Sequence, residues 1–500
     1  MSAPHHGLTR FDQLMKICLQ GDGPAQAPLA QTLGRLMPAN PVHLKNLDHQ
    51  DVVDALHTLA DDMRADVNVD DPNAADAGMT FFGQFVDHDI TLDATSALGT
   101  RIDPSTILNI RTPGLDLDCV YGSGPEASPH LYGADSQDHM LVFGRKENPL
   151  DLARTCAGKA LIGDPRNDEN ILVAQVQGLF IALHNILMTK AMEGGIEAQD
   201  IRACAHDGIA KKVWDDHVKQ TLTTFEEVRR FIRLHYQWIV WTELLPAFVD
   251  TACLNDALAT DFFGAHPAIM PVEFTGACYR FGHATTQFEY KLTETGEAKG
   301  LFEIMGFQKR EVSGNIDYRM FFQLDGGPKA QKARPVGPKL GAPLLKLPFI
   351  TGTTSFTDAD GQSVTLTEPQ SQNLALRNMI RDRYTYQLAS GQQVAARVGA
   401  HPVAVPDVLK AKGFKKTPLW FYALQEAEEH GHGKLTGAGG AIVASVFANL
   451  LKRDRSTVLH LPHFKPWGQF GGQKTCLAGI IAYVEANRGH IADPHALMCG

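Results

Sequence analysis

The chain has 500 residues, of which 44% are hydrophobic and 20% are charged, as in an ordinary globular protein. This composition excludes a disordered or fibrous chain. The formal net charge of −10 excludes a basic field over the whole chain, the kind that binds nucleic acid.

Apolar spacing predicts the main helices in chain order. Residues 1–60 contain Pro- and Gly-rich breaks and are expected to form an irregular N-terminal wrap. Residues 61–500 are expected to form a second, separate region. Helical periodicity predicts a helix over 74–91, a long helix over 170–192 and another over 223–245.

The remaining segments also favour helices over strands. A further helical segment is expected after Phe274, and strand-like alternation is confined to short stretches such as 316–323. Residues 92–165 are expected to be rich in loops, and residues 325–350 are too rich in Pro, Gly and Lys for regular structure. Further helices are expected over 367–388, 418–429 and 440–452. We therefore expect a mainly α fold.

Cysteines and the N-terminus bear on the cellular compartment. The eight cysteines are scattered without a C-x-x-C pair, which favours reduced, mostly buried thiols over a disulfide scaffold or a zinc site. The N-terminus lacks the apolar core of a secretory signal, and no uninterrupted run of about 18 apolar residues predicts a membrane span. These features favour a soluble, cytoplasmic protein and leave non-classical export open.

The segment FFGQFVDHDITLD, residues 81–93, concentrates polar groups on a predicted helix. Gln84, Asp87 and His88 stand at i, i+3 and i+4 and share one face. Asp89 is rotated by about 100° from His88 and points elsewhere. The face offers an amide, a carboxylate and an imidazole to one site; a helix end with solvated acids is the alternative.

The segment RTPGLDLDCVYGSG, residues 111–124, alternates oxygen-bearing residues. Asp116 and Asp118 lie two apart, after Thr112 and Gly114. Hard oxygen ligands at alternate positions, some from the backbone, are what Ca²⁺ prefers. The pattern predicts a calcium site, with a solvated acidic loop as the alternative.

Two further motifs are indecisive when taken alone. Arg166 and Glu169 lie three apart at the start of the long predicted helix and therefore share a face. His283 lies in an apolar segment with Arg280 three residues before it. A lone histidine in such a segment is more often a core residue than a ligand.

In this order, the motifs resemble those of the animal-type haem peroxidases, the peroxidase–cyclooxygenase superfamily. The family's G-Q-x-x-D-H-D, its calcium loop followed by V-Y-G-S, and its R-x-x-E, R-x-G-H and L-x-N-x-x-R all occur between residues 83 and 381. The resemblance implies a helical core around a buried haem, with residues 61–500 as the catalytic domain.

The resemblance also implies roles on the distal side of the haem. His88 would be the distal histidine and Arg166 the distal arginine, and Gln84 would border the halide and peroxide pocket. Asp87 and Glu169 would form ester bonds to a haem b derivative.

On the proximal side, His283 would be the iron ligand, and Asn378 would accept the N–H of its imidazole. Arg280 and Arg381 would each bind a haem propionate.

By the same resemblance, calcium would be bound by Asp89 together with Thr112, Gly114, Asp116 and Asp118.

General chemistry agrees with these roles. A neutral imidazole beside peroxide can act first as a base and then as an acid. A guanidinium supplies permanent positive charge where the departing oxygen becomes negative. A hydrogen-bond acceptor behind an iron-bound imidazole fixes its tautomer and raises its electron donation.

The chain also departs from parts of the family. Asn170 stands where one branch carries a methionine linked to the haem, so no such link is expected. The segments after Arg381 and around residues 418–450 look more like the bacterial branch. We expect His430 and His432 in a solvated loop.

The resemblance implies a haem peroxidase that reduces hydrogen peroxide and oxidises halides or small aromatic donors through a ferryl intermediate. The nearest alternative is a fatty-acid dioxygenase of the same superfamily. Such oxygenases carry a radical tyrosine three residues before the proximal histidine, whereas Tyr279 lies four residues before His283. A non-catalytic, calcium-stabilised binding protein is the third possibility, and the oligomeric state is open.

Overall fold

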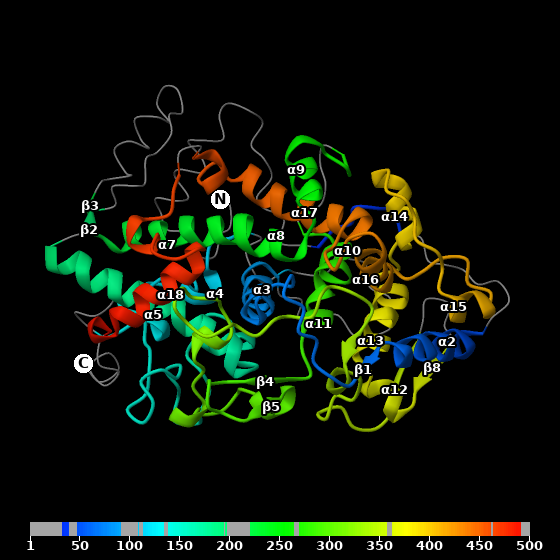
Figure 1. Ribbon diagram of the computed structural model, residues 1–500, viewed down its shortest axis with the longest axis horizontal. Helices are drawn as coiled ribbons and strands as arrows, with labels where there is room; N and C mark the ends of the chain where they lie inside the picture. The colour runs from blue at the N-terminus through cyan, green and yellow to red at the C-terminus, as the bar shows by residue number, and fades with distance from the viewer. Residues whose placement is uncertain are drawn as a thin grey trace.

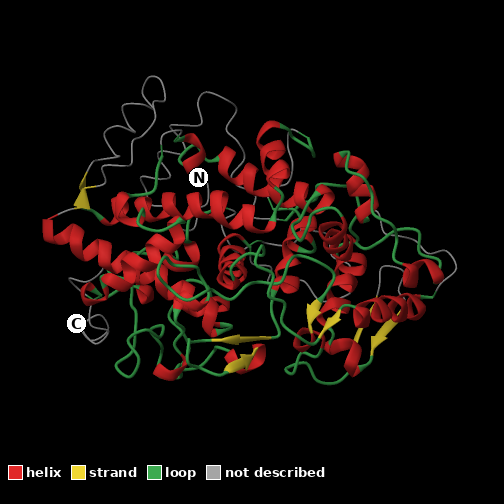
Figure 2. Ribbon diagram, in the orientation of Figure 1, coloured by secondary structure: helices red, strands yellow, loops and turns green. Residues whose placement is uncertain are grey.

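Helices make up most of the described chain, and strands occur only in short pairs (Figure 2). The structure is a computed structural model. It describes residues 33–39, 48–91, 109, 114–134, 139–194, 196–197, 221–264, 270–357, 363–461 and 464–491. The mainly α fold predicted from the sequence is confirmed.

The α-helices of the first half include the long buried helix α5. They are α2 (His49–Asp62), α3 (Ala77–Ile90), α4 (Asp118–Tyr121), α5 (Ile171–Gly194), α7 (Phe225–Ile239), α8 (Leu245–Phe248) and α9 (Thr251–Ala259).

The α-helices of the second half are mostly shorter. They are α10 (Val272–Thr275), α11 (Gly282–Thr285), α12 (Glu368–Gln372), α13 (Leu374–Ile380), α14 (Gly391–Val398), α15 (Asp407–Ala411), α16 (Leu419–Glu429), α17 (Gly437–Arg453) and α18 (Cys476–Ala486).

Two π-helical turns extend longer helices, and such turns are frequent at functional sites. η5 (Val240–Leu244) joins α7 to α8, so the helix expected over 223–245 exists but passes through a π turn. η11 (Arg381–Thr385) follows α13 directly. Arg381 is the first residue of this turn.

The strands form four separate two-stranded sheets in the described chain. The parallel pair joins β1 (Arg64–Ala65) to β6 (Leu340–Gly341), with Arg64 opposite Leu340. The antiparallel pairs are β2 (Ile196–Glu197) with β3 (Thr221–Leu222), β4 (Glu289–Lys291) with β5 (Ala298–Gly300), and β7 (Thr354–Thr357) with β8 (Ser363–Leu366).

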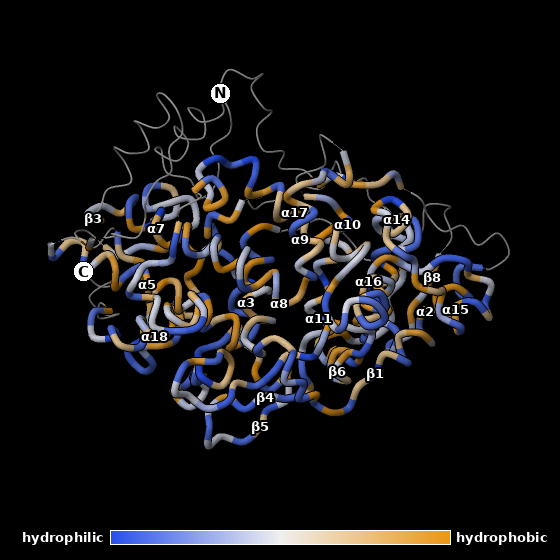
Figure 3. Tube along the Cα trace, turned by 45° about the horizontal axis from the view of Figure 1, so that its top comes forward, coloured by the Kyte–Doolittle hydropathy of each residue, from blue (hydrophilic) through white to orange (hydrophobic). Residues whose placement is uncertain are grey.

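Helix α3 lies at the centre of the molecule, and α5, α7 and α18 lie on one side of it (Figure 1). On the other side, α13 packs against α2 and α16 packs against α17. Hydrophilic segments are concentrated in the outer loops (Figure 3). The centre of the fold is therefore built from helices buried on most of their faces.

Helix α5 is long and apolar enough to cross a membrane by length and composition alone. However, 94% of its most apolar window is buried inside the structure. It is the one helix in the described part of the chain that meets this test. Its burial identifies it as the core helix that the sequence predicted over 170–192.

Three sequence predictions about local structure are wrong. The segment 316–323 contains the 3₁₀ turn Tyr318–Met320, because Asp317 caps a turn there by accepting from the N–H of Arg319. Residues 325–350 contain β6 and a 3₁₀ turn over Ala342–Leu345. Helix α2 occupies the end of the segment 1–60, which was expected to be irregular, and continues past residue 60. The helix forms because its Val and Leu residues pack inward.

The cysteines in the described part of the chain form no disulfide with one another. Cys119, Cys278 and Cys476 are buried, Cys253 is partly buried and Cys156 is exposed. This agrees with the expected reduced state; the other three cysteines lie outside the described residues.

Candidate active site

Aromatic packing fixes the orientation of helix α3. The ring of Phe85 stacks on Phe180 of α5 with centroids 5.2 Å apart, and Tyr236 of α7 packs edge-on against both rings. Such aromatic pairs have preferred geometries, so they restrict rotation of the helix about its axis. This packing determines which side chains of α3 turn toward the neighbouring turn at residues 165–168.

The polar residues of α3 divide between two directions. Gln84 and His88 both bond to residues of the 165–170 segment, and Asp87 is partly buried near them. Asp89 is fully buried and bonds instead to the backbone around α4. The structure thus brings three of the predicted residues to one site and places the fourth at another.

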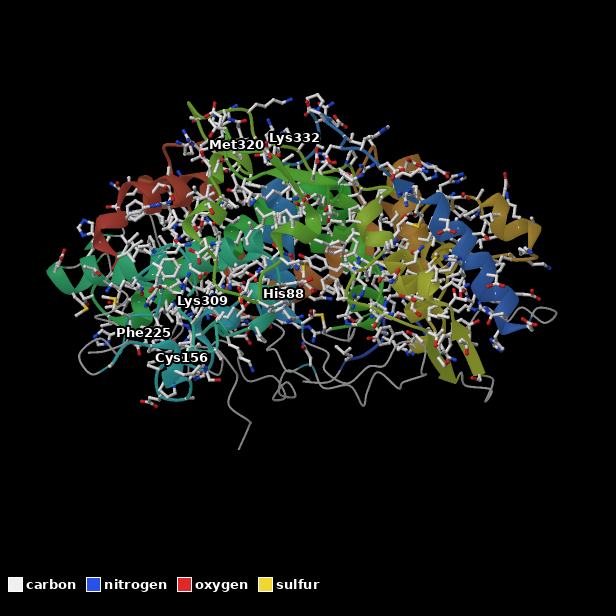
Figure 4. The ribbon with its side chains drawn as sticks, turned by 90° about the horizontal axis from the view of Figure 1, so that it is seen from below. His88, Cys156, Phe225, Lys309, Met320 and Lys332 are labelled. Carbon is white, nitrogen blue, oxygen red and sulfur yellow. The ribbon has the colours of Figure 1, made fainter. Side chains whose placement is uncertain are left out.

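His88 is buried deep among the side chains of the central helices (Figure 4), with only 5% of its surface exposed. Its Nδ1 lies 2.7 Å from Oδ1 of Asn167. Burial, followed by the nearby positive charge of Arg166, lowers the pKa of His88 to about 4. His88 is therefore neutral at pH 7 and able to accept a proton.

Arg166 lies on the 3₁₀ turn η4 (Pro165–Asp168) and is fixed by several acceptors. Asp164 caps this turn through the Arg166 N–H and pairs with the guanidinium at 2.8 Å from Nη2. Nη2 also donates to the carbonyls of His88 and Thr91 at the end of α3. The positive charge is thereby fixed beside His88. Asp164 is a positioning residue that the sequence analysis missed.

A buried ion-pair network supports the turn that carries Arg166. Arg154 forms a bidentate pair with Asp168, with N–O distances of 2.6 and 2.7 Å. The same guanidinium donates to Asp151, which also accepts a hydrogen bond from Arg145 at 2.7 Å. A bidentate pair fixes both the distance and the plane of its partners.

The backbone of residues 306–307 packs against the other side of this turn. The N–H groups of Gly306 and Phe307 donate to the carbonyls of Glu169 and Asp168 at 2.8 and 2.7 Å. A Cβ at Gly306 would lie 1.8 Å from the Asp168 carbonyl oxygen, so only glycine allows this approach.

Glu169 faces Gln84 across the gap between η4 and α3. Gln84 donates to Glu169 at 3.1 Å and accepts a hydrogen bond from Asn170 at 3.1 Å. Burial raises the pKa of Glu169. The side-chain oxygen of Asn170 also accepts from the N–H groups of Leu172 and Val173, so it caps α5. This residue, where one branch has methionine, therefore orients Gln84.

His283 lies on α11, directly after the 3₁₀ turn η6 (Cys278–Phe281). Burial, followed by the charges of Arg280 and Arg381, lowers the pKa of His283 to about 3. The imidazole is therefore neutral, as a metal-binding histidine must be.

Asn378 contacts His283 as the sequence predicts, but its amide has the opposite direction. Its Nδ2 lies 3.0 Å from Nδ1 of His283, and its Oδ1 accepts from Arg381 at 3.3 Å. Iron binding through Nε2 needs a proton on Nδ1 and an acceptor beside it. The amide would have to turn by about 180°, which exchanges the long contact with Arg381 for a direct hydrogen bond.

Arg280 is fixed from both its side chain and its backbone. Its Nε donates to the carbonyl of Thr275 at 2.8 Å, and its own carbonyl accepts from the indole N–H of Trp420 at 3.3 Å. The backbone N–H of Trp420 donates in turn to the carboxylate of Asp382, the residue after Arg381. Trp420 and Asp382 tie the segment before His283 to η11, and neither was singled out in the sequence.

The segments that carry His88 and His283 are joined directly. Thr80 of α3 and Thr285 of α11 form a hydroxyl hydrogen bond of 2.9 Å. Tyr279 donates to the carbonyl of Gly83 at 3.3 Å, and burial raises its pKa well above the ordinary value. The tyrosine hydroxyl is therefore engaged by the backbone of α3.

A second cluster lies at the start of α4. Carboxylate oxygens of Asp89, Asp116 and Asp118 lie within 4.8 Å of one another, and all three residues are buried. Burial raises the pKa of Asp89 to about 6, although Leu117, Cys119 and Tyr236 donate hydrogen bonds to it.

The other two predicted calcium ligands are not part of this carboxylate cluster. Gly114 is partly buried two residues before Asp116, and Thr112 lies outside the described residues. The buried His184 of α5 lies between the hydroxyl of Tyr121 and the carbonyl of His139. His430 and His432 are exposed.

The residues around the two histidines fit a haem. A Cβ at Gly282, beside His283, would meet no atom within 4 Å, so there is open space at this position. The side chains that would contact the ring are partly accessible, although the helices around them are buried. These side chains are those of Gln84, Asp87, Glu169, Arg280, His283 and Arg381.

Comparison with known proteins supports the resemblance to the animal haem peroxidases. The sequence pattern of the animal haem peroxidase family matches residues 94–317. The curated relative peroxidasin homolog pxn-2 of Caenorhabditis elegans is 23% identical over 38% of this chain, and chorion peroxidase of Drosophila melanogaster is 27% identical over 36%. The matches span only 14% and 22% of those relatives.

Solved structures share the fold over nearly the whole chain. Peroxidase A from Dictyostelium discoideum matches with a TM-score of 0.56 and 14% identity, covering 95% of this chain and 97% of its own. Fatty acid alpha-dioxygenase from Oryza sativa matches with a TM-score of 0.55 and 15% identity, covering 92% and 80%. The chain is thus similar to the animal haem peroxidases in sequence over residues 94–317, and it shares its fold with a peroxidase and a dioxygenase over nearly its whole length.

The family match does not include the whole candidate site. It begins after Asp89 and ends before Asn378. The fold supplies both missing parts, because α3 packs on α5 and Asn378 of α13 contacts His283. The similarity supports haem as the cofactor and includes both peroxidases and fatty acid dioxygenases among the similar proteins.

The buried pair Arg154–Asp168 should be essential for stability. Arg154→Ala leaves Asp168 buried without its cation, so we expect the free energy of unfolding to fall by about 3–5 kcal/mol in chemical denaturation. Arg319→Ala is the control, because Arg319 pairs with Asp317 while half of its side chain is exposed. This change should have a much smaller effect, because solvent screens an exposed ion pair. Equal losses in the two variants would contradict the supporting role of Arg154.

Proposed function

We propose that the protein is a haem peroxidase that reduces hydrogen peroxide and oxidises small donors such as halides or phenols. The observation that supports this most strongly is the neutral, buried imidazole of His88 beside the fixed guanidinium of Arg166. A base needs a neutral form at the working pH, and charge that develops during bond cleavage needs a preorganised cation. The two groups together suit cleavage of a peroxide bond.

His88 would move one proton between the two peroxide oxygens. Its ring nitrogen accepts the proton from the oxygen that stays and returns it to the oxygen that leaves as water. Arg166 lowers the energy of the negative charge on the leaving oxygen, and its position costs no reorganisation because Asp164 already orients it. Gln84, oriented by Glu169 and Asn170, would border the peroxide.

The haem would bind between α3 and α11 and supply the iron at which peroxide reacts. His283 would hold the iron through Nε2, and Asn378 would accept the N–H of its Nδ1 after the amide has turned. Arg280 and Arg381 would neutralise the propionates. We assign Asp87 and Glu169 to ester bonds with the haem, and retention of haem after acid–acetone extraction of the peroxide-treated protein would report these bonds.

A fatty-acid dioxygenase is the second candidate. The observation that favours it is the shared fold with a solved fatty acid alpha-dioxygenase, together with the buried Tyr279 close to the site. Against it, the Tyr279 hydroxyl is engaged by the carbonyl of Gly83 and lies four residues before His283. The peroxidase is therefore the preferred function.

The activity test compares wild-type protein with His88→Ala. With haem supplied, we expect peroxide-dependent oxidation of guaiacol and of bromide, and a loss of roughly 10²-fold or more in the variant because the general acid–base group is absent. His430→Ala is the control, since this histidine is exposed and should have no effect. Oxygen uptake with linoleate in the absence of peroxide would instead favour the dioxygenase. A haem-loaded protein inactive in every assay would favour a binding protein.

We also propose that Asp89, Asp116 and Asp118 bind Ca²⁺. Three buried carboxylates so close together repel one another unless a cation or protons neutralise them. Oxygen ligands suit calcium, and the loop backbone could extend the set beyond the carboxylates. Because Asp89 follows His88 on α3, the ion would stabilise the end of the helix that carries the base.

Removal of calcium should therefore lower both stability and turnover. EGTA treatment should remove the stabilisation from binding, which is about 2.7 kcal/mol at a hundredfold excess of ion over Kd. Metal analysis and thermal melting with and without added Ca²⁺ measure this effect. Asp118→Asn should abolish the response to EGTA, whereas Asp407→Asn, at an exposed surface pair, should keep it. A metal-free wild-type protein with unchanged melting temperature would refute the calcium site.

A further inference from the structure

A line of side-chain hydrogen bonds leads from His88 to the backbone of α4. Nδ1 of His88 lies 2.7 Å from Oδ1 of Asn167. Nδ2 of Asn167 donates to Oε1 of Gln177 at 2.8 Å, and Nε2 of Gln177 donates to the carbonyl of Cys119 at 3.2 Å. Asn167, Gln177 and Cys119 are all buried, so water does not compete for these groups.

The last member of this line determines the direction of all the others. The carbonyl of Cys119 can only accept a hydrogen bond, so Gln177 must present its NH₂ group to it. The oxygen of Gln177 then faces Asn167 and requires the NH₂ group of that residue. The oxygen of Asn167 is left facing His88, and Nδ1 of His88 must carry the proton.

The reversed line is unfavourable because it places two acceptors together. If Asn167 turned its NH₂ group to His88, Gln177 would also have to turn, and its oxygen would face the Cys119 carbonyl at 3.2 Å. Two carbonyl oxygens at this distance without a proton between them repel each other, and no water screens them in the buried site. The direction is therefore fixed by the backbone and does not depend on the imidazole itself.

We infer that Asn167 and Gln177 are positioning residues that hold neutral His88 in the tautomer with its proton on Nδ1 and a bare Nε2. This inference rests on the proposed function, because it makes Nε2 the atom that accepts the peroxide proton. Nε2 makes no hydrogen bond to any described residue. Without the relay the two tautomers of a neutral imidazole compete, and only one of them offers a base at Nε2.

The end of the relay is itself held rigidly. A Cβ at Gly163 would lie 2.6 Å from the Cys119 carbonyl oxygen, so the backbone of residue 163 packs closely against it. The N–H of Cys119 points to Asp89 Oδ1 at 3.4 Å. The residue that anchors the relay thus also contacts the acidic cluster, by a path separate from the peptide bond between His88 and Asp89.

The direct test is to observe the tautomer of His88 by NMR. The full-length chain is produced under haem depletion with ¹⁵N-labelled histidine, and the two-bond and three-bond proton–nitrogen correlations distinguish a protonated Nδ1 from a protonated Nε2. His88 is assigned from the signals missing in His88→Gln. We expect Nδ1–H in the wild-type protein. A wild-type His88 with its proton on Nε2 overturns the inference whether or not the protein is a peroxidase.

The variants separate positioning from simple packing. Asn167→Leu and Gln177→Leu should each shift His88 toward a mixture of tautomers or toward Nε2–H. Asn167→Asp should retain Nδ1–H, because a carboxylate can only accept. Gln175→Leu is the matched control: Gln175 is also a buried glutamine of α5, but it bonds to the backbone of Ile316. It should leave the His88 tautomer unchanged.

A kinetic measurement on the haem-loaded protein completes the test. We expect the rate constant for reaction with peroxide to fall about tenfold or more in Asn167→Leu, to recover at least partly in Asn167→Asp, and to be unaffected by Gln175→Leu. The KM for guaiacol should not change. An unchanged tautomer in Asn167→Leu and Gln177→Leu, with an unchanged peroxide rate, would overturn the inference.

Discussion

The contact between helix α3 and the turn at Pro165–Asp168 is the interaction on which the site depends. Across this contact Arg166 bonds the end of α3, Asn167 bonds His88, and Glu169, next after the turn, bonds Gln84. A movement of either element would therefore displace the cation, the partner of the base and the neighbouring carboxylate together. The contact is made of buried polar groups. Removing one hydrogen-bond partner of such a group destabilises the fold by more than the intact hydrogen bond stabilises it.

The other half of the site is assembled from later parts of the chain. His283 is oriented by Asn378 of α13, while Trp420 of α16 and Asp382 of the π turn fix the backbone before it. Hydrogen bonds from Thr80 and Tyr279 connect this half to α3. The two histidines thus belong to separately supported units joined at the N-terminal part of one helix. An open position beside His283 and two arginines next to it suit a large anionic cofactor such as haem.

The sequence predicted the elements that have strong apolar periodicity and missed those that lack it. Helices α3 and α5 were predicted correctly because most of their residues are buried. The alternation at 316–323 suggested a strand, but the structure has a 3₁₀ turn there. At the site, the motifs indicated the side chains that we propose carry the chemistry. They did not identify Asp164, Arg154 or Gln177. The role of each of these residues depends on a hydrogen-bond partner that comes near only when the chain folds. Asn170 was noted only for the methionine it replaces, yet it caps α5 and orients Gln84. The amide direction of Asn378 also could not be read from a motif, since it depends on Arg381.

Titration of the purified full-length chain with haem tests the central claim most directly. If His283 is the axial ligand in a preformed site, the wild-type protein should bind one haem per chain, with the absorption and electron paramagnetic resonance spectra of an imidazole-ligated iron. His283→Ala should bind haem weakly or without that signature, while His184→Ala, a change at another buried histidine of the core, should retain it. Failure of the folded wild-type protein to bind haem, or identical spectra for wild type and His283→Ala, would contradict the site described between α3 and α11.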